Sequence, residues 1–333
     1  MSTDSKKQLM QTYIPILQKY GIILVLMALV LGLSIASENF LTTSNIFNVL
    51  TQSAIFGIMA LGMTLVITSK GIDLSVGSVL AFSGVVAASF AQASTATNKY
   101  FPDMPELPVI IPVLVAIVIG FSLGSINGFF IAYTGIPAFI ATLGMMTIAR
   151  GFALLYTDGR PVSQFTDGMR FFGSRLFGEI PVPVLVYAIM IAITWILLGY
   201  TSFGKTVYAI GGNVKAAEIS GVNVKRNLVL IYGFSGLCAA VAAIVFAGRV
   251  GTVHPGAATG FELTAIAATT IGGTSHYGGI GTIWGAVVGA LVLAVVRNGL
   301  TLLGIHAYWQ QIVEGAIIIT AVIIDMRKNA RKK

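Results

Sequence analysis

Charged residues are scarce in this chain. They make up 10% of its 333 residues, whereas hydrophobic residues make up 56%. Soluble domains carry roughly 25% charged residues, so this composition excludes an ordinary water-soluble protein. The chain also lacks the alternating segments of about ten residues that form transmembrane barrels. It contains instead continuous apolar runs such as "VPVLVYAIMIAITWILLGY", close to the ~20 residues that a membrane-spanning helix requires.

Residues that commonly carry site chemistry are also few. The single cysteine, Cys238, lies in an apolar segment, so an intramolecular disulfide is excluded. His254, His276 and His306 are dispersed without metal-ligand spacing, and we expect no metal site. No motif combines a nucleophile, a base and an orienting group, so no catalytic residue is predicted. The net charge of +8 comes from basic residues at the ends of apolar segments, which points to membrane orientation and not to nucleic acid.

The apolar runs predict an all-α integral membrane protein with about ten transmembrane helices. We expect residues 1–20 to form a cytoplasmic N-terminal segment, 21–325 a single membrane domain and 326–333 a basic cytoplasmic tail. The beginning of the chain is similar to a signal peptide, with lysines before an apolar run that ends in "SIAS"; we interpret it as a retained first span. The predicted spans lie near 21–37, 46–68, 75–92, 108–133, 136–156, 181–200, 227–248, 263–280, 282–303 and 307–325.

The distribution of lysine and arginine predicts the orientation. With the N-terminus inside, thirteen of these residues fall in inner segments and five in outer segments, so both termini are expected in the cytoplasm. Residues 157–180 carry three arginines on the predicted outer side, against the rule. Arg150, near the outer end of the fifth span, is expected to extend its side chain to the interface.

Two pairs of similar segments suggest an internal repeat. "GIDLSVGSVLAFSGV" from Gly71 matches "GFELTAIAATTIGGT" from Gly260, and "NGFFIAYTGIPAF" from Asn127 matches "NGLTLLGIHAY" from Asn298. The first acidic motif begins a span that leaves the cytoplasm, and the second begins a span that enters from outside. The two halves are therefore predicted to be inverted repeats, as in many transporters.

Polar residues within the spans give a candidate translocation path. The acids that open two spans can cap helix N-termini or can line a path together with neighbouring hydroxyl groups. Amides in lipid likewise seek a helix partner or a wet cavity. Both interpretations remain open for the candidate path residues, which are Asp73, Ser75, Asn127, Glu262, Thr264 and Asn298.

Two further features predict helix packing. Glycines that recur every four residues allow close approach of helix backbones, which is expected at positions 120, 124 and 128 and at 281, 285 and 289. Arg297 and Glu314 occur at similar depths, ~9 to 10 Å from the same membrane surface at 1.5 Å per residue. Because unpaired charges there are costly, we predict a structural ion pair between them.

The most polar internal stretch follows the sixth predicted span. "GYTSFGKT" at 199–206 satisfies the phosphate-loop pattern, but a membrane span precedes it where a soluble strand is required, so we reject an ATP site. In "GGNVKAAEISGVNVKR", Asn213 can cap a short helix that begins at Val214, and Gly221 can end it. A helix of about two turns is marginal alone, so it requires a partner surface.

This stretch, with "GIPAFIATLGMMTIARG" and "IGGTSHYGGIGTIWGAVVGALVLAVVRNGL", resembles the permease subunits of ribose-type ABC sugar importers. The resemblance implies a homodimer or heterodimer of ten-span permeases in a bacterial inner membrane, with partner ATPase subunits that hold ATP and Mg and a periplasmic sugar-binding protein. It also implies that segment 201–226 couples the permease to the ATPase. The residues expected to couple are Gly211, Gly212, Asn213, Ala216, Ala217, Glu218, Ser220 and Gly221.

The mechanism that this resemblance implies is alternating access driven by the partner ATPases, with a small sugar as the solute. The sequence leaves the sugar open. The alternative is a self-sufficient ion-coupled transporter, for which Asp73, Glu262 and Glu314 are candidate ion sites.

Overall fold

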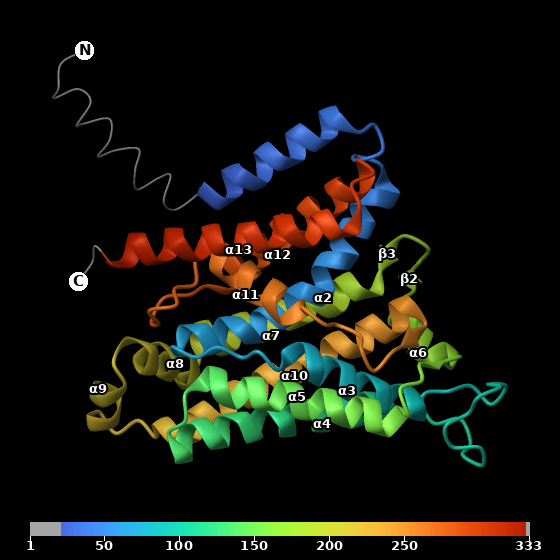
Figure 1. Ribbon diagram of the computed structural model, residues 1–333, viewed down its shortest axis with the longest axis horizontal. Coiled ribbons are helices and arrows are strands. Elements are labelled where there is room, and N and C mark those ends of the chain that lie inside the picture. The colour runs from blue at the N-terminus through green and yellow to red at the C-terminus, as the bar shows by residue number, and fades with distance from the viewer. Residues whose placement is uncertain (1–20, 331–333) are drawn as a thin grey trace.

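A computed structural model describes residues 21–330, with side chains to Arg327, as a bundle of long helices (Figure 1). The predicted N-terminal segment 1–20 lies outside the described residues. The helices are Gly21–Ala36, α2 (Thr43–Thr68), α3 (Val76–Phe90), α4 (Ile110–Phe129), α5 (Ala138–Thr157), α6 (Asp167–Phe171), α7 (Val182–Tyr200), α8 (Ser202–Gly212), α9 (Val214–Ile219), α10 (Val224–Val250), α11 (Phe261–Ile271), α12 (Ile283–Leu302) and α13 (Ala307–Ala330). A π-helical turn, Phe130–Thr134, continues α4.

Among the described residues, seven helices are long and apolar enough to cross a membrane: α2, α4 with its π-helical turn, α5, α7, α10, α12 and α13. Three shorter apolar helices, Gly21–Ala36, α3 and α11, occupy the other predicted spans. The predicted span 263–280 is wrong in its extent, because α11 ends at Ile271. Gly273 there has a φ of +89°, and the carbonyl of Gly272 lies against Gly285 of α12, so the chain turns away from the helix axis.

The core surrounds α2 and α10, which cross near the middle of the bundle (Figure 1). In α2, 83% of the most apolar stretch is buried, whereas none of the equivalent stretch of α13 is, so α2 is central and α13 peripheral. The first predicted glycine seam is present. An added Cβ at Gly120, Gly124 or Gly128 of α4 would overlap the backbone of α10. In the second seam, Gly285 and Gly289 lie against the backbone of α11 and the turn after it, whereas Gly281 precedes α12.

The bundle has two different ends. One end carries α8, α9 and the last turns of α13 and is called the α9 end here; the other carries α6 and short strands and is called the α6 end (Figure 1). At the α6 end, β1 (Val162–Ser163) pairs with β4 (Thr252–Val253), and β2 (Arg175–Leu176) pairs with β3 (Ile180–Pro181). The all-α prediction missed these strands, which are too short to produce a period-two pattern. The β1–β4 pair joins the predicted loop 157–180 to the segment after α10, whereas β2 and β3 form a short hairpin at the end of that loop.

Candidate functional site

The polar segment 201–226 folds as two short helices with defined ends. The Thr201 hydroxyl accepts from the amide of Gly204 at the start of α8, and Asn213 Oδ1 accepts from the amide of Ala216 at 3.1 Å at the start of α9. Gly221, with a φ of +83°, ends α9, and the amide of Val222 donates to the carbonyl of Ala217. The phosphate-loop pattern at 199–206 covers the end of α7 and the beginning of α8, so a helix of 19 residues, and not a strand, leads directly into it.

α9 presents one apolar side chain prominently to its surroundings. Ile219 is 88% exposed, and Val214 is partly exposed on the same short helix. Ala217 faces the opposite way and is buried against the core. Of the other predicted coupling residues, Gly211 is buried, whereas Gly212, Asn213, Ala216, Glu218, Ser220 and Gly221 are exposed. α9 is therefore a small projection with an apolar tip and a polar rim.

The end of α8 is fixed to the core. Gly211 lies against the carbonyl of Thr68, the last residue of α2, and against the amide of Gly279. The same Thr68 carbonyl accepts from the amide of Gly279 at 2.8 Å, and Tyr208 of α8 donates to the carbonyl of Gly281 at 2.7 Å. α8 therefore contacts both the end of α2 and the segment that leads into α12.

Three of the predicted path residues meet inside the subunit. Asp73 Oδ1 accepts from the amide of Ser75 at 3.0 Å and from its hydroxyl at 2.6 Å, and Asn127 Nδ2 donates to that hydroxyl at 2.9 Å. Ser235 of α10 donates to the other Asp73 oxygen at 2.8 Å. All four side chains are buried, so this cluster binds α3, α4 and α10 together and faces no open space. Ser235 gave no sequence signal, because its partner lies 162 residues away.

The other predicted path residues lie in separate places. Glu262 begins α11, accepts from the amide of Gly260 at 3.1 Å and lies against Gly77 of α3. Asn298 forms two amide hydrogen bonds with Asn45 of α2, at 3.0 and 2.7 Å. The matching asparagines of the proposed repeat, Asn127 and Asn298, therefore both have helix partners.

The Arg150 side chain does not extend freely from α5 but binds the backbone of another segment. Its Nη1 donates to the carbonyls of Pro255 and Ala257 at 2.7 Å each. These carbonyls belong to the irregular segment between β4 and α11 and have no helix to satisfy them. Two hydrogen bonds from the half-buried guanidinium to these carbonyls are more favourable than extension of the Arg150 side chain to the membrane interface.

Arg297 and Glu314 form the ion pair that the sequence predicts, with Nη2 to Oε2 at 2.5 Å. Thr264, a predicted path residue, donates to Glu314 Oε1 at 2.6 Å and accepts from Arg297 Nη2 at 3.0 Å. The guanidinium also lies over the ring of Phe56, 4.4 Å from its centroid. The pair thus joins α12 to α13 and, through Thr264 and Phe56, to α11 and α2.

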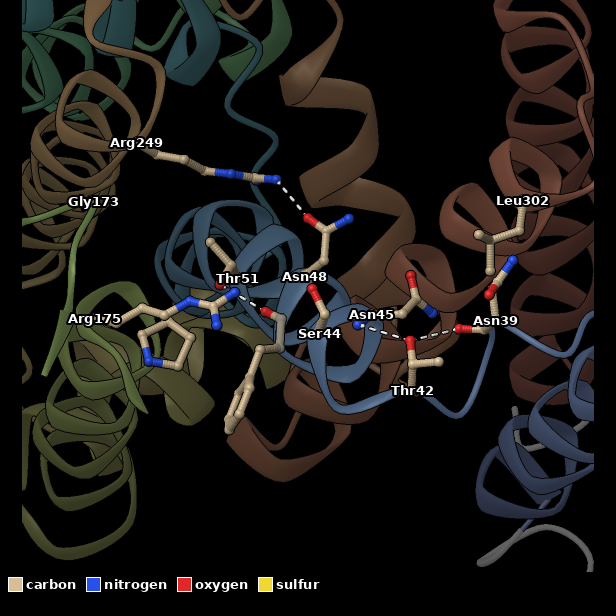
Figure 2. Close-up of a pocket in the computed structure, with 12 residues that line it drawn as sticks. Asn39, Thr42, Ser44, Asn45, Asn48, Thr51, Gly173, Arg175, Arg249 and Leu302 are labelled. Atoms are coloured by element: carbon tan, nitrogen blue, oxygen red, sulfur yellow. Dashed lines mark hydrogen bonds between the residues drawn. The ribbon is translucent and has the colours of Figure 1, made fainter. Parts of the chain in front are cut away.

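Two cavities open near the α6 end. The larger, about 440 Å³, lies between the beginning of α2, the end of α10 and the end of α12 and is called the vestibule here (Figure 2). Most of its lining residues are polar. Arg249 donates to Asn48 at 3.1 Å, and Arg175 lies on the same side of the view as Arg249 (Figure 2). The second, about 260 Å³, is called the aromatic cavity and shares Arg249 with the vestibule. Sequence reasoning missed both, because their walls come from segments about 200 residues apart.

The part of the chain that the structure describes contains no group of three or more His, Cys, Asp or Glu side chains that could hold a metal ion.

Comparisons with known proteins identify relatives over the whole chain. A family model described as "Branched-chain amino acid transport system / permease component" matches residues 45–322. The galactose/methyl galactoside import permease protein MglC of Escherichia coli K12 is 40% identical over 340 residues, covering 100% of both chains. The ribose import permease proteins RbsC of E. coli K12 and Bacillus subtilis 168 are each 41% identical, covering 92% and 95% of this chain and 93% and 95% of theirs. No solved structure matches the chain.

Proposed function

The chain belongs to the family of branched-chain amino acid transport system permease components, and we propose that it is the permease subunit of an importer for a small sugar, driven through segment 201–226 by partner ATPase subunits. The sugar class follows from the relatives, which are named as ribose and galactose/methyl galactoside import permeases. A pentose or a hexose in its neutral form is thus the expected solute.

The observation that carries the coupling proposal is the projection formed by α9. Ile219 is almost fully exposed at its tip, and α8 ties its base to the last residue of α2. An exposed apolar side chain with a polar rim suits a protein groove, where buried apolar anchors supply most of the binding energy. We place the ATPase at the α9 end, with ATP and Mg held by that partner.

The α6 end then faces the periplasm. Under this orientation both termini are cytoplasmic, and Gly21–Ala36, α3 and α11 complete ten membrane-inserted helices in two inverted halves. A periplasmic sugar-binding protein would dock on the segments at the α6 end, beside the vestibule. A second permease subunit, identical or different, would complete the translocation path in a bacterial inner membrane.

We propose alternating access as the mechanism. Closure of the two ATPase subunits displaces α9, and the contact between Gly211 and Thr68 transmits this displacement to α2. Because α2 is the central helix, its movement changes the packing between the halves of the subunit. In this scheme the buried cluster of Asp73, Ser75 and Asn127 maintains the position of α3 against α4.

The test uses the permease with its ATPase subunits and binding protein in proteoliposomes. Ile219→Asp should weaken retention of the ATPase subunits about 30-fold or more, the change that a hot-spot residue produces. Phe177→Asp is the matched control, because Phe177 is 90% exposed but lies at the α6 end. Equal ATPase retention by both variants would contradict the coupling proposal. Sugar uptake by the permease alone, driven by an ion gradient, would establish the ion-coupled alternative.

A further inference from the structure

The aromatic cavity lies where five helices meet, and no part of the proposed coupling mechanism uses it. Its walls come from α2, α10, α11, α12 and α13, and it contains three phenylalanine rings together with polar side chains. Its volume of about 260 Å³ lies near the lower limit of small-molecule sites, which span roughly 300–1,000 Å³ for drug-sized ligands. Its size therefore suits a single small solute.

The aromatic side of the cavity is a rigid cluster. The Phe56 and Phe261 rings pack edge to face with centroids 4.7 Å apart, and Phe246 packs on Phe261 in the same way at 6.2 Å. Rings fixed in this manner offer an apolar surface against which the C–H face of a sugar ring can pack, at little cost in side-chain entropy.

The polar side chains of the cavity keep unused hydrogen-bonding groups. The Gln52 carboxamide makes no side-chain hydrogen bond within residues 21–327, and Gln310 uses only its Nε2. Both hydrogen bonds of the Arg297 guanidinium use Nη2, so the donors on Nη1 and Nε remain available. These groups can exchange hydrogen bonds with water for hydrogen bonds with a ligand that has several hydroxyl groups.

The lining of the cavity carries one charge without an ion-pair partner, that of Arg249, and the neutral character of the ligand follows from the proposed function. Glu314 neutralises Arg297. Arg249 donates to the neutral amide of Asn48, and the other lining residues are uncharged, so the lining contains no carboxylate. Arg249 also lines the vestibule, so the two cavities adjoin at this side chain.

We propose that the aromatic cavity is a binding subsite for one neutral monosaccharide on its way through the permease. The phenylalanine rings contact the apolar face of the sugar, and Gln52, Gln310 and Arg297 bind its hydroxyl groups. This inference rests on the proposed function, since it assumes that a sugar enters from the α6 end. It assigns to Arg297 a ligand contact in addition to its ion pair.

The experiment uses the complete transporter in proteoliposomes, with labelled D-ribose and D-galactose as probes and saturating binding protein. Gln52→Leu keeps the side-chain size but removes the amide, and should lower the uptake rate about tenfold, the effect of one lost hydrogen bond. Gln52→Asn, which retains an amide, should recover part of that rate. ATP hydrolysis stimulated by sugar-loaded binding protein should persist in both variants.

A second measurement reports on the cavity directly. The only cysteine is buried Cys238, so Cys238→Ala provides a background for Gln52→Cys. A membrane-impermeant thiol reagent should label Gln52→Cys, block uptake, and react more slowly when a sugar is present. Ile46→Cys, on the exposed side of the same helix, is the control whose labelling should leave uptake intact.

Wild-type uptake of neither sugar would refute the proposed function. Normal uptake by Gln52→Leu, or by labelled Gln52→Cys, would overturn the subsite alone. Stronger protection of Gln52→Cys by a hexuronic acid than by the neutral sugars would overturn the assignment of a neutral ligand.

Discussion

Gly211 lies directly against the carbonyl oxygen of Thr68, so closely that a methyl group on Gly211 would overlap it. The neighbouring Gly212 has open space at the position of a Cβ. The two consecutive glycines thus have different surroundings. Gly211 packs against the end of α2, whereas Gly212 has open space beside it. The segment proposed to meet the ATPase is therefore joined to the core on one side only.

This asymmetry gives a matched pair of variants. Gly211→Ala should destabilise the junction by about 1–3 kcal/mol, because the added methyl group has no space, whereas Gly212→Ala should change stability by less than about 0.5 kcal/mol. We expect Gly211→Ala to lower sugar uptake per ATP hydrolysed and Gly212→Ala to preserve it. Thermal unfolding and coupled uptake assays measure the two effects, and equal behaviour of the variants would refute this transmission route.

Glu314→Ala should destabilise the permease strongly. The pair is mostly buried, and removing one partner leaves Arg297 without compensation, at a cost of about 3–5 kcal/mol where burial is complete. The control is Arg160→Ala, which removes the partner of Asp158 in an ion pair that is almost fully exposed and worth about 0–1 kcal/mol. Unfolding temperatures of both variants in detergent provide the comparison. Unchanged stability in Glu314→Ala would show that the pair is not structural.

Arg150→Met should loosen the segment between β4 and α11. The variant removes two hydrogen bonds to the carbonyls of Pro255 and Ala257, while the apolar side chain retains most of the packing volume. Hydrogen exchange of residues 254–260 should become faster, with little change in α10. Arg170→Met, an exposed arginine at the same end, is the control. Unaltered exchange in Arg150→Met would mean that the segment holds its conformation without the arginine.

The segment between α3 and α4 should respond to acid. The backbone amide of Ser94 donates to Glu106 at 2.6 Å, and this hydrogen bond lowers the pKa of the Glu106 carboxyl. The stabilisation is thus complete above the ordinary pKa of about 4.3 and is lost as the pH falls through the lower folded value. Exchange protection of the Ser94 amide, corrected for intrinsic rates, should disappear in that range. In Glu106→Ala it should be absent even at neutral pH, and persistent protection there would contradict the assignment.

Local signals in the sequence predicted local structure well. Asn213 and Gly221 define the ends of α9 because capping depends on neighbours within a few residues. The pairing of Arg297 with Glu314 also followed from local reasoning, since the two residues flank one short connection and lie at equal depth. The roles that we assigned to α9 and to the pair remain proposals.

Features that depend on distant segments could not be predicted. Arg150 binds carbonyls more than 100 residues away, and Ser235 binds Asp73 across 162 residues. α11 ends earlier than predicted, at Ile271, where the backbone of α12 lies against the next residue, Gly272, and Gly273 has a positive φ. Hydropathy records how apolar a segment is but not what lies beside it. The aromatic cavity could likewise not be predicted, because its side chains come from five helices that are distant in the sequence.

The glycine seam between α4 and α10 limits how this subunit can change shape. At three successive turns, backbone meets backbone with no side chain between them whose rotamer could change to permit sliding. α4 and α10 must then move as one rigid body during import. Any sliding of one helix against another must occur at other helix contacts. The movements that open a passage must therefore come from helices that pack on their neighbours through larger side chains.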